Sequence, residues 1–177
     1  MAQTYSFDQQ LADFESAVSG QIFDAAATLL ATKPSRALAA LRLMVSYFEA
    51  IAKYDSGFGQ QGQSRRFFVD GCRLVLARQK RREPGTVEPS TEQLQAFYEI
   101  VRCGLAHGAT LSRNVALGVG NYALMVSTDG RQMIVNPEGL LELLREDHQI
   151  YISSLKPLAN EQQRANFQAR WDYETSL

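Results

Sequence analysis

Cysteines are scarce in this chain, and long apolar runs are missing. The two cysteines, Cys72 and Cys103, have neither the spacing of zinc ligands nor the number that a disulfide framework needs. The longest uncharged stretch, 114–128, is interrupted by glycines and is shorter than the ~20 residues that span a bilayer. The first residues lack the basic and apolar segments of a secretory signal. We therefore expect a cytoplasmic protein without a membrane segment.

Metal and nucleotide motifs are missing as well. No cluster of His, Cys, Asp and Glu has metal-ligand spacing, and no glycine-rich phosphate loop follows a strand pattern. The sequence thus predicts neither a metal site nor a cofactor.

A strong net charge is also absent. The 18 basic residues nearly balance the 19 acidic ones, which gives a net charge of −1, so the protein as a whole is not an electrostatic binder of nucleic acid. One stretch, 65–82, is nevertheless basic, because its seven lysines and arginines are opposed by Asp70 alone. It predicts either a solvated helix face, which we favour, or a phosphate-binding surface. The phosphate-binding candidates are Arg65, Arg66 and Arg73.

Helical signals dominate the first hundred residues, and the 177-residue length allows one domain with a sizeable core. Apolar residues recur at spacings of three and four after Ser6, after Pro34, from 65 to about 79, and after Ser90. Both serines open a capping-box pattern. The third of these helices should bury its apolar side chains and turn its arginines outward; the inward residues are Phe68, Cys72, Val75 and Leu76.

The pattern changes after residue 108. Two short strands within about 119–136 are joined by a turn containing Asp-Gly, which predicts a β-hairpin. Asn136 followed by proline predicts the start of a helix over about 137–157, with His148 on its surface or flank. In the tail, 158–177, Phe167 and Trp171 lie four residues apart, which favours a docked short helix.

These elements predict a mainly α fold. We expect a single domain over 1–177, in which an up-and-down, four-helix-type bundle spans about 6–108. The small β-hairpin and the additional C-terminal helix follow it.

The most informative motif is Arg102-Cys103-Gly104-Leu105-Ala106-His107, at the end of the fourth apolar helical pattern. A guanidinium offers planar donors to a phosphate, and an imidazole with a near-neutral pKa can transfer protons. Five residues are about 500° of helix rotation, which leaves Arg102 and His107 roughly 140° apart on a straight helix. They converge if the helix unwinds near Gly108, if the arginine reaches round, or if a second protomer completes the site. The small residues nearby favour the last option, a homodimer.

This arrangement resembles the Arg-x4–6-His signature of HEPN domains, over about 6–108 of the chain. The resemblance implies an α-helical bundle, commonly dimeric, and many members of that family are metal-independent ribonucleases. It implies that Arg102 and His107 form the catalytic pair of an endoribonuclease, with Arg102 steadying the phosphate and His107 transferring protons. Glu49, on the flank of the second helix, is a candidate for orienting Arg102.

The sequence also allows two other interpretations of the function. Active HEPN members often carry Asn, Asp or His beside the arginine, whereas this chain has Cys103 and Gly104. The alternative is a non-catalytic relative that binds RNA, a nucleotide or a protein partner. A third reading is a helical interaction protein with a cognate protein partner and no ligand site. In that case Arg102 is a surface arginine paired with Glu49 or Glu99, and His107 is a helix-terminal residue.

Overall fold

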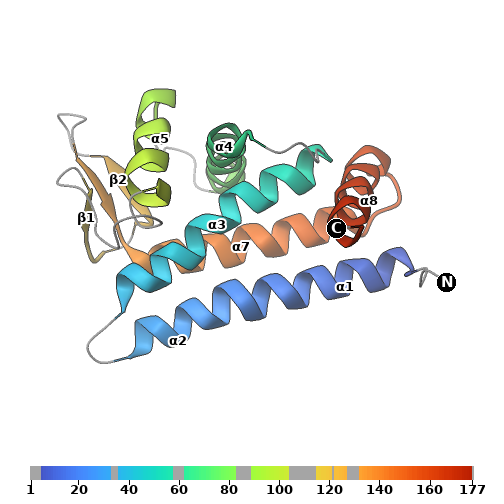
Figure 1. Ribbon diagram of the computed structural model, residues 1–177, viewed down its shortest axis with the longest axis horizontal. Helices are drawn as coiled ribbons and strands as arrows, with labels where there is room; N and C mark the ends of the chain where they lie inside the picture. Colours follow the sequence, from blue (N-terminus) through green and yellow to red (C-terminus); the bar gives the residue numbers. More distant parts are fainter. Residues whose placement is uncertain are drawn as a thin grey trace.

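The computed structural model describes residues 5–32, 36–57, 62–82, 89–103, 115–120, 122–126 and 132–176. Figure 1 shows its helices stacked in layers, with the short strands at one end. In chain order the elements are α1 (Phe7–Val18), the π-helical turn η1 (Ser19–Asp24), α2 (Ala25–Ala31), α3 (Ala37–Ser56), α4 (Ser64–Arg82), α5 (Thr91–Phe97), the π-helical turn η2 (Tyr98–Cys103), β1 (Val115–Leu117), β2 (Leu124–Val126), β3 (Met133–Val135), α7 (Pro137–Leu155) and α8 (Glu161–Thr175).

Helix α3 lies at the centre of this arrangement. It packs against α2 and η1, against α4, and against α7 and α8, so helices from both halves of the chain meet on it. Its buried residues recur at helical spacing on more than one face, which is the pattern of a helix surrounded by others. The largest fully buried side chains that it supplies are Leu41, Met44, Tyr47, Phe48 and Ile51.

The helix starts follow the predicted signals. The Ser6 side chain accepts a hydrogen bond from the Gln9 backbone N–H at the start of α1. The capping box predicted there is only half formed, because the Gln9 side chain donates to Asp13 instead. The Ser90 capping box is complete, because Ser90 accepts from the Gln93 N–H and Gln93 accepts from the Ser90 N–H. Asn136 caps α7 at the Glu138 N–H, with proline as its first helical residue. These contacts satisfy amide groups that a helix end leaves unpaired.

The predicted orientation of helix α4 is confirmed for its apolar residues and wrong for one of its arginines. Its apolar residues are buried as expected, and Arg65, Arg66 and Arg73 are exposed. The expectation that the arginines face outward is wrong for Arg78, whose side chain is only 12% exposed. Arg78 turns inward because Asp147 of α7 and Asp55 of α3 supply carboxylates beneath it, and a buried charge needs such partners.

The sheet contains the predicted hairpin and one further strand. β2 pairs antiparallel with β3, with Leu124 opposite Val135, and the turn predicted between them lies outside the described residues. β1 adds to the other side of β3 in parallel, so the order is β1-β3-β2. β1 was not predicted, because no turn motif joins it to β3, whereas the Asp-Gly turn marked β2 and β3 as a hairpin.

The C-terminal helices complete the predicted mainly α fold. α7 runs beneath α3, and α8 closes one end of the molecule. The docked tail helix is confirmed, since Phe167 of α8 is fully buried against the rings of Phe7, Phe14 and Tyr54. Across the described ranges, none of the helices has the length and hydropathy required to cross a bilayer.

Candidate functional site

Arg102 is placed by the helix that the Ser90 capping box begins. Leu94, Phe97 and Val101 are buried and hold α5 and η2 against the core, which leaves the Arg102 side chain 37% exposed on the outer side. Because η2 is π-helical, the rotation expected for a straight α-helix does not apply at Arg102. Single π-helical turns occur frequently at functional sites.

The Arg102 guanidinium lies beside the carboxylate of Glu49. The distance from Arg102 Nε to Glu49 Oε2 is 3.8 Å, so α3 and η2 bring together the pair that the sequence suggested. Two hydrogen-bond donors fix the carboxylate. Lys53 Nζ donates to Oε1 at 2.7 Å, and Ser64 Oγ donates to Oε2 at 2.7 Å. Glu49 is thus held from α3, from the start of α4 and from η2.

Glu49 is ionised in this setting. Its partial burial opposes the charged form and would by itself raise the pKa. The hydrogen bonds from Lys53 and Ser64, with the positive charges of Lys53 and Arg102, outweigh that effect and lower the pKa from its ordinary value. The cluster therefore contains two cations and one anion, which leaves it with one net positive charge.

The Nε atom of Arg102 is buried and receives no hydrogen-bond acceptor from the described residues. Glu49 is near enough to attract it but too far to form a hydrogen bond. Buried polar atoms usually have a partner, so an exception requires an explanation. Nε itself is out of contact with solvent, so an anion would meet the guanidinium at the exposed part of the side chain.

His107, the other half of the predicted catalytic pair, lies outside the described residues, as do all residues from 104 to 114. The convergence of His107 with Arg102 therefore stays a prediction. The same is true of the helix end expected at Gly108.

The three candidate phosphate-binding arginines line the exposed side of α4, and each has a partner. Arg65 pairs with Glu99 of η2. Arg66 and Arg73 lie on either side of Asp70, with nitrogen–oxygen distances of 3.5 and 3.7 Å. Exposed ion pairs of this kind contribute little stability, about 0–1 kcal/mol each. Their arginines can therefore exchange a carboxylate for another anion at low cost.

His148 is not on the surface of α7, which corrects the expectation for it. It is 1% exposed, with the rings of Phe14, Phe23 and Tyr47 around it at 5.6–5.9 Å. Neither ring nitrogen has a hydrogen-bond partner among the residues described. Burial lowers the pKa of His148 to about 4, and the nearby negative charge of Glu15 only partly opposes this. A buried neutral imidazole of this kind is part of the core.

The His148 environment predicts a loss of stability in acid. The unfolded chain takes up a proton near pH 6.5, while the folded protein does so only near pH 4. The free energy of unfolding therefore falls as the pH drops from 6.5 to 4, by about 3 kcal/mol for this group. Urea unfolding should show that the free energy of unfolding of the protein, taken relative to that of His148→Phe, falls by that amount over this pH range.

The comparison with His148→Phe also separates this effect from that of Asp147. Burial raises the pKa of Asp147 despite Arg78, so Asp147 alone would make the protein more stable as the pH falls. That contribution is common to both proteins and cancels. A stability difference that is constant from pH 7.5 to 4.5 would contradict the account of His148.

Parts of the site were not foreseen. Lys53 could have been found, because it stands four residues after Glu49 on one helix, where opposite charges pair. The same holds for Asp70, which lies four residues after Arg66 and three before Arg73 on α4. Ser64 had no such signal, since its contact with Glu49 depends on how α3 and α4 pack. In the described ranges, His, Cys, Asp and Glu nowhere gather in threes that could hold a metal ion.

Comparison with known proteins assigns no function, so the function has to be inferred from the geometry of the site. No protein-family model, no curated protein and no solved structure matches the chain.

Proposed function

We propose that this chain is a HEPN-like protein that acts on RNA as a metal-independent endoribonuclease, with Arg102 as the phosphate-binding residue. The observation that carries the proposal is the state of the Arg102 guanidinium. It is partly exposed, it is positioned by an ionised carboxylate, and its buried Nε lacks an acceptor among the described residues. A phosphodiester can bind the exposed part of the guanidinium and balance the net positive charge that Arg102, Lys53 and Glu49 leave.

The reaction follows from these groups and from His107. The ribose 2′-hydroxyl attacks the adjacent phosphorus, so the bond from O2′ to phosphorus forms and the bond to O5′ breaks. One proton leaves the hydroxyl, and one reaches the departing oxygen. His107 carries out one of these two proton transfers, and solvent water exchanges the other proton. Arg102 stabilises the charge that builds on the phosphate. Glu49 positions Arg102 and does not touch the RNA.

A homodimer completes this proposal. A two-fold axis near the end of η2 would bring two copies of Arg102 and His107 into one cleft. Light scattering is expected to give the mass of two chains, and the mass of one chain would remove this part of the proposal.

The test is cleavage of a mixed single-stranded RNA in EDTA, with the product ends identified by mass spectrometry. The protein should leave 2′,3′-cyclic phosphate and 5′-hydroxyl ends. Arg102→Ala should lower the rate by about 100-fold or more, and His107→Ala by a similar factor. Glu49→Gln should fall between these variants and the unchanged protein, because the guanidinium remains but is less well positioned.

Arg145→Ala is the matched control. Arg145 is also a partly exposed arginine paired with a carboxylate, Asp24, at 2.9 Å, and its removal should leave cleavage unchanged. Binding of RNA without cleavage, weakened in Arg102→Ala, would instead identify a non-catalytic binding module. Equal activity of all the variants would overturn the assignment of Arg102.

A further inference from the structure

A groove of about 410 Å³ runs between α4 and the start of α5. Its polar lining comes from both helices and from the residues just before α4: Gln63, Arg65, Arg66, Arg73, Thr91 and Gln95. Asp70 is the one carboxylate of the lining. The groove therefore combines three guanidiniums with hydroxyl and amide groups, which are the groups that proteins use to bind phosphates.

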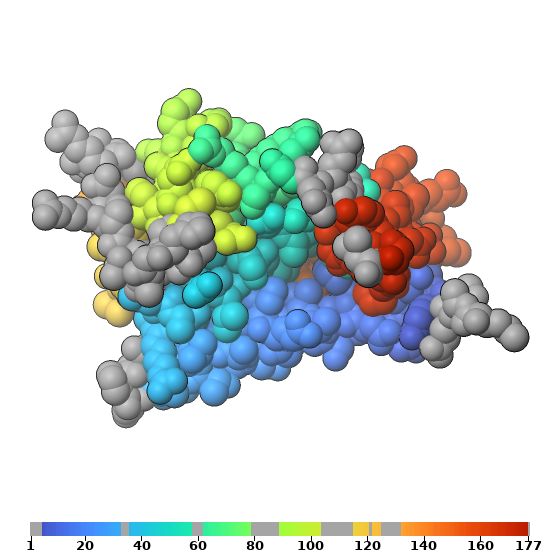
Figure 2. Space-filling model, viewed as in Figure 1, coloured from blue at the N-terminus to red at the C-terminus, as the bar shows by residue number. Residues whose placement is uncertain are grey.

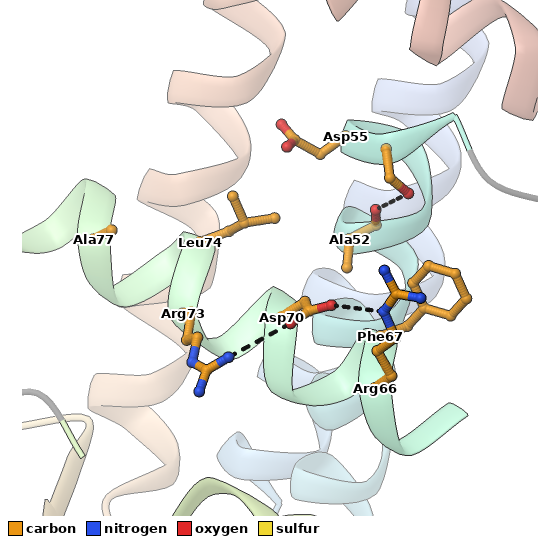
Figure 3. A pocket seen from close by; sticks show the side chains of 9 residues that line it. Ala52, Asp55, Arg66, Phe67, Asp70, Arg73, Leu74 and Ala77 are labelled. Carbon is orange, nitrogen blue, oxygen red and sulfur yellow. Dashed lines mark hydrogen bonds and ion pairs between the residues drawn. The ribbon is translucent and has the colours of Figure 1, made fainter. Parts of the chain in front are cut away.

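A second groove lies on the other side of the same α4 residues and has a different charge. It is about 400 Å³ and lies between α3 and α4. Figure 3 shows Arg66 and Arg73 reaching Asp70 from opposite sides there, with Asp55 at the edge. Two aspartates against two arginines make that lining neutral. The α4–α5 groove has three arginines against Asp70 and against Glu99, the partner of Arg65. It therefore keeps one net positive charge, which makes it the better suited of the two grooves to an anion.

The α4–α5 groove leads toward Arg102. At one end Arg73 donates a hydrogen bond to Thr91, the first residue of α5. At the other end Arg65 pairs with Glu99 of η2, and Ser64, beside Arg65, holds the carboxylate next to Arg102. Thr91 and Arg102 are separated by eleven residues, which is at most about 16 Å because part of this length is π-helical. This length suits a strand of a few nucleotides.

We infer that the α4–α5 groove binds the RNA strand that flanks the phosphate at Arg102, with Arg65, Arg66 and Arg73 on its phosphates. This inference rests on the proposed function and extends it from one phosphate to a run of them. The strand is single, because the hydrogen-bonding groups line one groove between neighbouring helices, whereas a duplex is contacted across two successive minor grooves.

Asp70 has a specific role in this groove. It lies between Arg66 and Arg73 and gives both guanidiniums a carboxylate in the absence of RNA. An incoming phosphate has to displace it, so Asp70 competes with the ligand. Its removal should therefore strengthen RNA binding, whereas a residue that only stabilised the groove would weaken binding when removed.

The test measures the affinity for a fluorescent, single-stranded 2′-O-methyl RNA, which lacks the attacking hydroxyl and is not cleaved. Asp70→Asn should bind about two- to fivefold more tightly than the unchanged protein. Asp24→Asn is the matched control, since it removes the same charge from the pair with Arg145. Asp24 belongs to η1, between α1 and α2, which Figure 2 shows along the opposite side of the molecule from α5. Asp24→Asn should leave the affinity unchanged.

Salt dependence gives a second measurement on separate variants. Each phosphate contact adds about 0.7 to the slope of log affinity against log salt for a single strand. Arg66→Gln and Arg73→Gln should each lower the slope by that amount, and Arg145→Gln should not. If Asp70→Asn fails to fold, these slopes decide the question.

The outcomes separate the groove from the proposed function. In the first outcome, RNA binding depends on Arg102, but Asp70→Asn and Asp24→Asn have equal affinities. The salt slopes of Arg66→Gln and Arg73→Gln are also unchanged. This outcome overturns the assignment of the α4–α5 groove and leaves the proposed function standing. An unchanged protein that does not bind the RNA overturns both.

Discussion

Replacing Arg78 with methionine is expected to lower the free energy of unfolding by about 3–5 kcal/mol. Arg78 Nη1 donates to both oxygens of Asp147 at 3.1 Å, and Nη2 donates to Asp55 at 3.1 Å. Tyr47 donates a further hydrogen bond to Asp147 at 2.8 Å. Arg78→Met leaves Asp147, which is 2% exposed, without its cation inside the core.

The cost comes from the unpaired carboxylate, so removing that charge as well should restore much of the stability. Arg78→Met combined with Asp147→Asn should recover more than half of the loss, because asparagine is neutral and still accepts from Tyr47. Arg145→Met, which breaks an exposed pair, should cost less than about 1 kcal/mol. Urea unfolding measures all three. A loss below about 1 kcal/mol for Arg78→Met would show that the buried network is not formed.

Gly71→Ala is the second substitution with a large expected effect. Gly71 of α4 packs directly on the backbone of α3, and a Cβ atom there would lie 1.7 Å from the carbonyl oxygen of Phe48. No side-chain movement relieves a clash with backbone, so the two helices have to separate. We expect a loss of about 4 kcal/mol, near the upper end for overpacking.

Gly20→Ala is the matched control for Gly71→Ala. Gly20 is also helical, within η1, and a Cβ atom at this position would meet nothing within 4 Å. Alanine there should be neutral or stabilising by up to about 1 kcal/mol, because glycine is a poor helix former. Equal thermal stabilities of the two variants would contradict the close contact between α3 and α4.

The helices could be predicted because their signals are local. The Ser90 capping box and the Asn136-Pro137 start act within three or four residues, and the apolar spacing reveals a buried face without reference to its partner. β1 gives no such signal, because it pairs in parallel with a strand that is distant in sequence and no short turn links the two.

Buried polar residues were harder to place, because their partners are distant in sequence. Arg78, like Arg73, is an arginine of α4 that does not lie on the apolar face of the helix. Only the packing of α7 brings Asp147 beneath Arg78. His148 lies among aromatic rings from α1, η1 and α3, none of which its own helix predicts. The contact of Arg102 with Glu49 could be suggested from the sequence, but the hydrogen bond from Ser64 that fixes Glu49 depends on the packing of α4.

The most direct test of the central claim is whether Arg102 binds an RNA phosphate. The measurement is the affinity of the unchanged protein, Arg102→Ala and Arg145→Ala for uncleavable 2′-O-methyl RNA. We predict at least about tenfold weaker binding for Arg102→Ala, the loss expected for one charge-assisted contact, and no change for Arg145→Ala. Equal affinities of the three proteins would contradict the account.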